Sequence, residues 1–190
     1  MKDMHKKTLF AIILPLFLLL LSYKIVFFLT PLTEPQQETI NFLQDDSMLT
    51  LNYASAEISH LEDVKKVMHY TNFLFYGLLL GVTLIFTYHR KKKKELLALL
   101  NISGKATVIF LSALLFLALT SFNFLFTVFH QIFFPQGNWM FATDSLIITT
   151  FPTPFFTSIA IKIFLLTLPI GILFILVSIH LEHDRKRERH

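Results

Sequence analysis

The side chains best suited to chemistry in this sequence are histidines. An imidazole can take up and release a proton near neutral pH, and eight histidines are present, whereas cysteine is absent. The absence of cysteine excludes disulfides, thiolate nucleophiles and thiolate metal ligands. Five histidines lie in basic tails or at the ends of apolar segments, where we expect a solvated or helix-end role. The other three, His60, His69 and His130, are the candidates for catalysis.

His60 has a carboxylate on each side at helical spacing. Glu57 lies three residues before it and Asp63 three residues after it, so either carboxylate can reach the imidazole across one helical turn. Such a partner would fix the tautomer and support a transient imidazolium, so Glu57 and Asp63 are candidate supporting or orienting residues. His69 follows His60 by nine residues and falls on nearly the opposite helix face. Taken singly, a histidine at a membrane interface is more often structural than catalytic.

A metal site and a serine nucleophile are the competing interpretations of these residues. Two histidines with Glu57, Asp63 or Asp144 could bind zinc, but the sequence has neither HExxH nor a tight His-x-x-x-His pair. We therefore predict no metal and no other cofactor. Ser59 adjoins His60, but neighbours one apart on a helix do not face each other, and no GxSxG motif occurs.

The elements that must position these residues are long apolar segments. Hydrophobic residues make up 54% of the 190-residue chain, and they are gathered in runs that can cross a bilayer, which takes about 20 residues. The predicted spans are about 9–29, 68–88, 106–129 and 159–181. Ionisable residues at mid-membrane are nearly absent, which argues against a transporter.

The basic residues indicate the orientation of the four spans. Most of the 17 lysines and arginines lie before the first span, in the connection 90–105, or after the fourth span. By the positive-inside rule, both ends of the chain and the basic loop 90–105 are cytoplasmic. The run Arg90–Lys94 then anchors the topology beside anionic headgroups, and we expect no nucleic-acid partner.

The segments 30–67 and 130–158 therefore face outward. The first contains a short amphipathic helix at 36–43, an alternating stretch at 48–53 that predicts a strand, and a helix that starts near Ser55 and leads into the second span. The second is rich in aromatic residues and is expected at the membrane interface. The predicted fold is a single all-α membrane domain, 1–190, with four transmembrane helices and a small mixed α/β extracytoplasmic cap.

Four stretches in or next to these outer segments carry a resemblance to a known family. They are Glu57-Ile58-Ser59-His60-Leu61-Glu62-Asp63-Val64-Lys65 and Phe129-His130-Gln131-Ile132-Phe133-Phe134, followed by Gly137-Asn138-Trp139 and Phe151-Pro152. In these residues, and in length and topology, the chain resembles the bacterial lipoprotein intramolecular transacylases, which are small four-span membrane enzymes.

The resemblance implies an activity and a catalytic pair. The substrate would be a lipoprotein whose N-terminal cysteine carries a diacylglyceryl thioether and a free α-amine. The enzyme would move the sn-2 acyl chain to that amine and give a lyso-form lipoprotein. The family's two catalytic histidines fall on His60 and His130. We expect His60 to be the base, because Glu57 or Asp63 can steady its charge, although the reverse assignment stays open.

This chemistry needs hydrogen-bond donors for the oxyanion and a dry site for acyl chains. The candidate oxyanion or substrate-binding residues are Gly137, Asn138, Trp139, Phe133, Phe134 and Phe151. Besides the lipoprotein, the expected partners are membrane lipids, and we expect a monomer. Two alternatives remain: a non-catalytic membrane adaptor or lipid-binding protein, and an intramembrane lipid hydrolase.

Overall fold

The computed structural model describes residues 2–45 and 47–187, and in this part of the chain the structure is entirely helical. In chain order the helices are α1 (Lys2–Leu29), α2 (Glu34–Asp45), α3 (Ser55–His89), α4 (Lys93–Phe133), α5 (Leu146–Thr150) and α6 (Thr153–Arg187). No strand occurs among the described residues, so the prediction of a mixed α/β cap was wrong.

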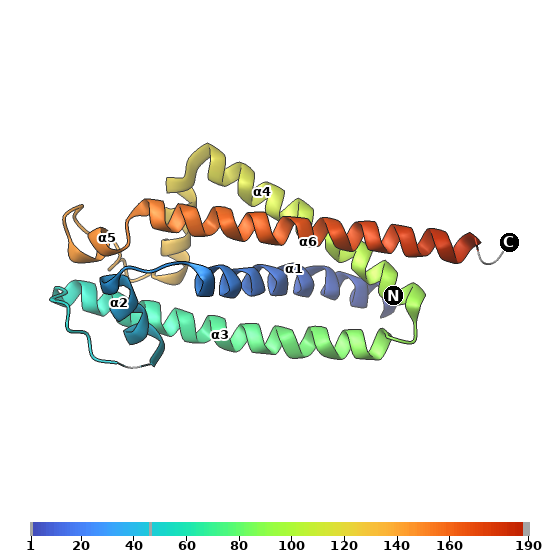
Figure 1. Ribbon diagram of the computed structural model, residues 1–190, viewed down its shortest axis with the longest axis horizontal. Helices are drawn as coiled ribbons and strands as arrows, with labels where there is room; N and C mark the ends of the chain where they lie inside the picture. The colour runs from blue at the N-terminus through green and yellow to red at the C-terminus, as the bar shows by residue number, and fades with distance from the viewer. Residues whose placement is uncertain (1, 46, 188–190) are drawn as a thin grey trace.

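Four long helices lie side by side and form the body of the molecule (Figure 1). Each of α1, α3, α4 and α6 is long and apolar enough to cross a membrane. The two chain ends and the connection between α3 and α4 gather at one end of the bundle, and α2 and α5 lie at the other end (Figure 1). The basic stretches of the sequence are thus separated from the cap by the length of the bundle.

The helix α3 is longer than a bilayer requires. Its 35 residues extend about 50 Å at about 1.5 Å per residue, whereas the hydrocarbon layer is about 30 Å thick. Its first three turns pack against α2 and the 142–151 segment. The part of α3 before the predicted span 68–88 therefore belongs to the cap, and His60 lies in this part.

The helices α4 and α6 approach each other closely through small residues. A Cβ atom built on Gly104 would lie 2.7 Å from the backbone oxygen of Gly171, which is closer than real Cβ contacts come. Thr107 packs against Gly171 at the same crossing. Small residues let membrane helices pack backbone against backbone, so this crossing fixes the position of the first half of α4.

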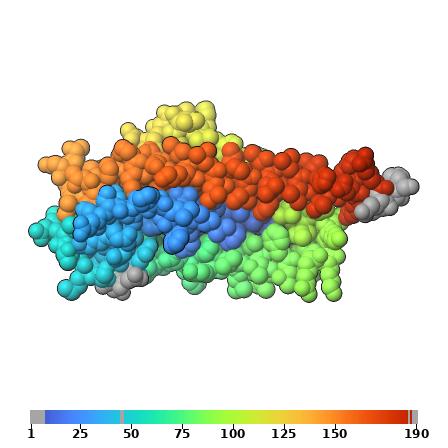
Figure 2. Space-filling model, viewed as in Figure 1, coloured from blue at the N-terminus to red at the C-terminus, as the bar shows by residue number. Residues whose placement is uncertain are grey.

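The helix α4 is broken at Ser121. This residue has φ −162° and ψ 87°, values outside the helical region, and the chain there bends out from the bundle and turns back toward it (Figures 1 and 2). The hydroxyl of Ser121 accepts the backbone N–H of Phe124, as an N-cap residue does. The hydroxyl of Thr120 donates a hydrogen bond to carbonyl oxygens of the preceding turn. The two hydroxyls thus satisfy backbone groups that the break releases. The predicted span 106–129 did not foresee this break.

The stretch 48–53 is irregular and not a strand, with a bend at Leu51 and a hydrogen bond from the Tyr53 N–H to the Leu51 carbonyl. The carboxylate of Glu38 on α2 accepts the backbone N–H groups of Thr50 and Leu51 and the hydroxyl of Thr50. These hydrogen bonds lower the pKa of Glu38, with the Leu51 N–H the largest cause. The Glu38 side chain thus accepts hydrogen bonds from backbone N–H groups that a partner strand would otherwise bind. The alternation of 48–53 instead places Tyr53 in the apolar core of the cap, with Ile40, Leu43, Leu61, Ile147 and Phe151.

Candidate functional site

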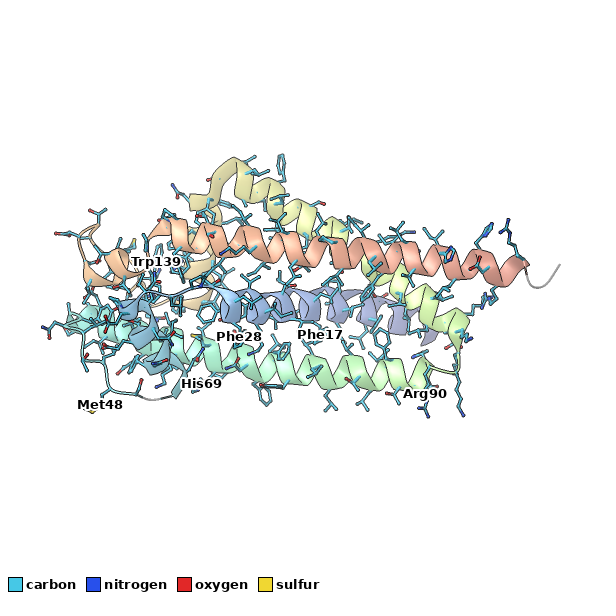
Figure 3. The ribbon with its side chains drawn as sticks, in the orientation of Figure 1. Phe17, Phe28, Met48, His69, Arg90 and Trp139 are labelled. Carbon is cyan, nitrogen blue, oxygen red and sulfur yellow. The ribbon has the colours of Figure 1, made fainter. Side chains whose placement is uncertain are left out.

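The fold brings His60 and His130 together at the capped end of the bundle. His60 lies in the second turn of α3, and His130 lies in the last turn of α4, beyond the break at Ser121. Their ring centroids are 6.2 Å apart and the ring planes differ by only 25°. The nearby Trp139 and the distant Arg90 mark the two ends of the molecule in Figure 3. Two imidazoles far apart in the sequence are thus near enough to act on one substrate group.

The proton position on His130 is set by its own helix. Nδ1 of His130 lies 2.7 Å from the carbonyl oxygen of Phe126, one turn earlier. A carbonyl oxygen can only accept a hydrogen bond, so Nδ1 carries the proton and Nε2 of the neutral ring keeps its lone pair. The rings of Phe126 and Trp139 cover His130 at 4.0 and 4.9 Å between centroids. His130 is therefore held as a proton acceptor in an aromatic environment.

His60 is more deeply buried than His130. Only 6% of its surface is exposed, and Phe134 and Phe141 lie 4.7 and 5.6 Å from it between ring centroids. Burial, and secondarily the nearby His130, lower the pKa of His60 to about 4, against smaller opposing contributions from Asn138 and Asp63. His60 is therefore neutral at physiological pH.

Glu57 does not pair with His60, in contrast to the expectation from spacing. One of its carboxylate oxygens accepts the backbone N–H of Ala54 at 2.7 Å, and the other accepts the backbone N–H of Ile147 at 2.9 Å. Glu57 thus caps α3 and ties the 142–151 segment to that helix. It is itself only 4% exposed.

Asp63 also binds partners other than His60. Its carboxylate accepts hydrogen bonds from Gln136 at 2.6 Å, from Asn138 at 2.9 Å, and from the Lys66 ammonium at 2.9 Å. These bonds, that of Lys66 first, lower the pKa of Asp63. Asn138 makes a longer contact through the same amide nitrogen to Ser59, at 3.4 Å. The loop 134–138 is thereby fastened to the α3 face next to His60.

The candidates for oxyanion binding differ in whether they have a free N–H donor. Gly137 has φ 80°, which suits glycine, and its N–H is bonded to the carbonyl of Phe134 in a turn, so this N–H is not free to bind an oxyanion. The amide nitrogen of Asn138 is bonded to Asp63. Trp139, against His130, is the candidate whose indole N–H makes no hydrogen bond among the described residues.

The three candidate phenylalanines have different surroundings. Phe134 is 3% exposed and contacts both imidazoles. Phe133 is 45% exposed and contacts Phe129. Phe151 is buried in the cap core, and its ring contacts Phe155 and Phe156. Of the three, only Phe134 contacts either imidazole.

Sequence reasoning missed three residues that contact the site. Phe126 lies four residues before His130, so helical periodicity could have indicated it. Phe141 and Gln136 come from irregular loops, and no spacing rule places them. His69 is exposed and faces a separate open hollow lined by Phe42, Glu62, Lys65 and Lys66.

The described part of the chain holds no group of side chains that could bind a metal ion. Among these residues, no three histidine, aspartate or glutamate side chains gather closely enough to hold a metal ion. The fold and its composition define a multi-pass membrane protein with four membrane-length helices.

Comparisons with known proteins identify the family. The model of the family described as lipoprotein intramolecular transacylase Lit matches residues 30–156. The chain therefore belongs to the lipoprotein intramolecular transacylases, which are membrane acyltransferases. No curated protein matches the chain.

Solved structures of such an enzyme share the fold. The membrane-integral lipoprotein intramolecular transacylase of Bacillus cereus superposes with a TM-score of 0.75 at 21% identity, over 96% of this chain and 99% of that one. A variant of it with one histidine replaced by alanine gives a TM-score of 0.76 at 20% identity, over 98% and 96% of the two chains. A variant with arginine at that histidine gives 0.73 at 20% identity, over 97% and 95%.

Proposed function

We propose that His60 and His130 are the catalytic pair of this transacylase. The reaction moves the sn-2 acyl chain of a diacylglyceryl-modified lipoprotein to the α-amine of its N-terminal cysteine and leaves a lyso-form lipoprotein. The observation that carries the proposal is the 6.2 Å separation of the two rings, which lets both imidazoles reach one reacting centre. Because donor ester and acceptor amine belong to one molecule, holding them together can supply about 7–11 kcal/mol of the barrier.

The proton balance of the reaction suits two imidazoles. The amine nitrogen attacks the ester carbon, a C–N bond forms, and the bond from that carbon to the sn-2 oxygen breaks. Nitrogen loses one proton and the released glycerol oxygen gains one. An amine that arrives as the ammonium ion loses a further proton to solvent, at a pKa of about 7.7–8.0. The enzyme must therefore accept a proton from nitrogen and deliver one to oxygen.

His130 is the better proton carrier of the two. Its Nε2 has a free lone pair because Nδ1 is bonded to Phe126, so Nε2 can take the proton from nitrogen and pass it to the leaving oxygen. The positive charge that forms on the ring is supported by the Phe126 carbonyl. His60 stays neutral because of its burial, and it can accept a hydrogen bond from the amine and aim the nitrogen lone pair at the ester. This exchanges the roles expected from the sequence.

Trp139 is the proposed oxyanion donor. Its ring lies beside that of His130. Its indole N–H can therefore donate a hydrogen bond to the oxyanion that forms on the ester carbon next to His130. Phe126, Phe134 and Phe141 line the imidazoles. Their rings exclude water, so that the acyl chain is transferred to nitrogen rather than hydrolysed.

The proposed orientation places this site at the extracytoplasmic interface. The basic connection between α3 and α4 and both chain ends lie at the end of the bundle opposite to the cap. By the positive-inside rule that end is cytoplasmic. The chain then runs N-in and C-in, with the basic residues 90–105, of which those from Lys93 on belong to α4, inside and segments 30–67 and 130–158 outside.

The test is the conversion of a synthetic diacyl lipopeptide by the purified full chain in lipid or detergent, followed by mass spectrometry. Transfer leaves the total mass unchanged and moves one acyl chain to the nitrogen, which fragmentation detects. His130→Ala is expected to lower kcat by about 10²–10⁴-fold, the usual contribution of a positioned acid–base group, and His60→Ala is expected to lower it as well.

The matched control is His69→Ala, which removes an exposed histidine on the same helix as His60 and should leave the rate unchanged. Full activity in His60→Ala or His130→Ala would contradict the assignment of the pair. Loss of one acyl chain from the total mass would identify the alternative, a lipid hydrolase.

A further inference from the structure

The amide of Asn138 is held in one orientation by its neighbours. Its nitrogen Nδ2 lies 2.9 Å from a carboxylate oxygen of Asp63 and 3.4 Å from the hydroxyl oxygen of Ser59. The reverse orientation would set the amide oxygen against the carboxylate, and two acceptors repel each other. Asp63 is itself held by Gln136 and Lys66. Oδ1 of Asn138 therefore faces away from Asp63.

Two buried polar atoms near this amide have complementary needs. Oδ1 of Asn138 is buried and has no hydrogen-bond partner, and Nδ1 of His60 is also buried and has none. Buried polar atoms in folded proteins are nearly always paired. Oδ1 can only accept a hydrogen bond, and Nδ1 can donate one when it carries the ring proton. Asn138 also counts among the contributions that raise the pKa of His60, as expected of an acceptor beside an imidazole.

We propose that Asn138 is a positioning residue that accepts a hydrogen bond from Nδ1 of His60 when the substrate is bound, with Asp63 holding the amide in place. The proton on Nδ1 leaves the lone pair on Nε2, as in His130. Both imidazoles then present an acceptor nitrogen to the amine. This inference rests on the proposed catalytic pair, and it removes Asn138 from the candidates for the oxyanion.

The inference assigns Asp63 an indirect role. Its carboxylate supports His60 through the orientation of a neutral amide, not through an ion pair with the ring. The charged and titratable groups that act on His60 are His130 on α4 and Asp63 on α3. A change at position 138 or 63 should therefore alter the tautomer and the pH response of His60 more than the affinity for the lipid chains.

The experiment uses three variants of the full chain and one control. Asn138→Leu removes the acceptor at similar size, and Asp63→Asn releases the anchor. Asn138→Asp combined with Asp63→Asn exchanges the two side chains, so that position 138 keeps an acceptor at Oδ1 and the charge moves next to His60. Asn52→Leu changes an exposed asparagine of the cap and serves as the control. For each, kcat and KM are measured against pH with the diacyl lipopeptide, and nitrogen NMR of labelled histidine reports the ring tautomer, with His60 assigned by difference from His60→Gln.

We expect Asn138→Leu to lower kcat about 10- to 100-fold with little change in KM, because a buried nitrogen loses its partner. The NMR spectrum should show the His60 proton moving from Nδ1 toward Nε2. Asn138→Asp combined with Asp63→Asn should keep most of the activity at high pH and shift the acid limb of the profile upward, because the charge now beside His60 favours the imidazolium. Asp63→Asn should lower kcat and shift the His60 tautomer in the same direction as Asn138→Leu, but by less. Asn52→Leu should have the same kcat and KM as the unmodified chain.

The opposite results would overturn the inference. If Asn138 donates to the oxyanion, Asn138→Asp combined with Asp63→Asn is inactive at every pH and the His60 tautomer is the same in all variants. If Asn138→Leu fails to fold, as thermal unfolding would show, Asn138→Asp combined with Asp63→Asn, and Asp63→Asn alone, still separate the two outcomes. Loss of activity in His60→Ala together with an unchanged tautomer in the Asn138 variants would contradict this inference alone, whereas full activity in His60→Ala would contradict the proposed pair.

Discussion

Replacing Glu57 by glutamine tests how the cap is attached to the helix that carries His60. The carboxylate holds two backbone N–H groups, those of Ala54 and Ile147, at 2.7 and 2.9 Å. Glutamine keeps one acceptor oxygen, but its NH₂ group then faces one of the two N–H donors. If this donor is that of Ile147, a buried N–H loses its partner, at a cost of about 1–3 kcal/mol. The 142–151 segment would then open more readily from α3.

The assay is amide hydrogen exchange, which reads the opening of this segment directly. A cost of about 1–3 kcal/mol corresponds to exchange about 5- to 150-fold faster at Ile147. Residues at the Gly104–Gly171 crossing should exchange as before, because they lie at a distance from the cap. Glu62→Gln is the matched control, since Glu62 is an exposed residue of the same helix. Unchanged exchange at both Ala54 and Ile147 in Glu57→Gln would refute the view that this carboxylate fastens the cap.

Two further predictions concern packing and pH. Gly104→Ala should lower the stability by about 1–3 kcal/mol, because its Cβ would meet the backbone oxygen of Gly171. The control Gly77→Ala, whose Cβ would meet nothing within 4 Å, should be neutral or slightly stabilising. Equal thermal stability of the two variants would contradict the close crossing. The pKa of His60 is lowered from 6.5 to about 4, so the unfolded chain binds the proton more readily and stability is lost as pH falls through this window. His60→Gln should lose less stability between these pH values, as thermal unfolding against pH would show, and an equal loss would argue that His60 is not buried in its neutral form.

Much of the molecule could be predicted from the sequence because membrane helices leave strong signals. Apolar runs of the right length indicated the four long helices, and the amphipathic stretch 36–43 lies within α2. The strand at 48–53 was wrong because alternation reports which side chains are buried and not what binds the backbone. There, Glu38 takes the N–H groups that a neighbouring strand would need.

The sequence indicated the two histidines of the candidate site, but not the contacts that surround them. His60 and His130 were candidates from the sequence, and the structure places their rings near each other. The spacing of Glu57 and Asp63 correctly sets both within one turn of His60, but spacing cannot tell which of several donors a carboxylate will bind. Both found backbone or amide donors from loops that only the tertiary fold brings near. The break at Ser121 was hidden because a Thr-Ser pair is compatible with a continuous membrane helix.

The divided form of α4 has a consequence for how the enzyme responds to the thickness of its host bilayer. The half before Ser121 is clamped to α6 at Gly104 and Gly171, while the half after it carries His130. A thicker or thinner hydrocarbon layer changes the tilt that a helix adopts, and the break lets the half that carries His130 adjust without moving the crossing at Gly104 and Gly171. Turnover in vesicles of short-chain and long-chain lipids should therefore differ, while the unfolding temperature of the bundle stays nearly constant across the same vesicles.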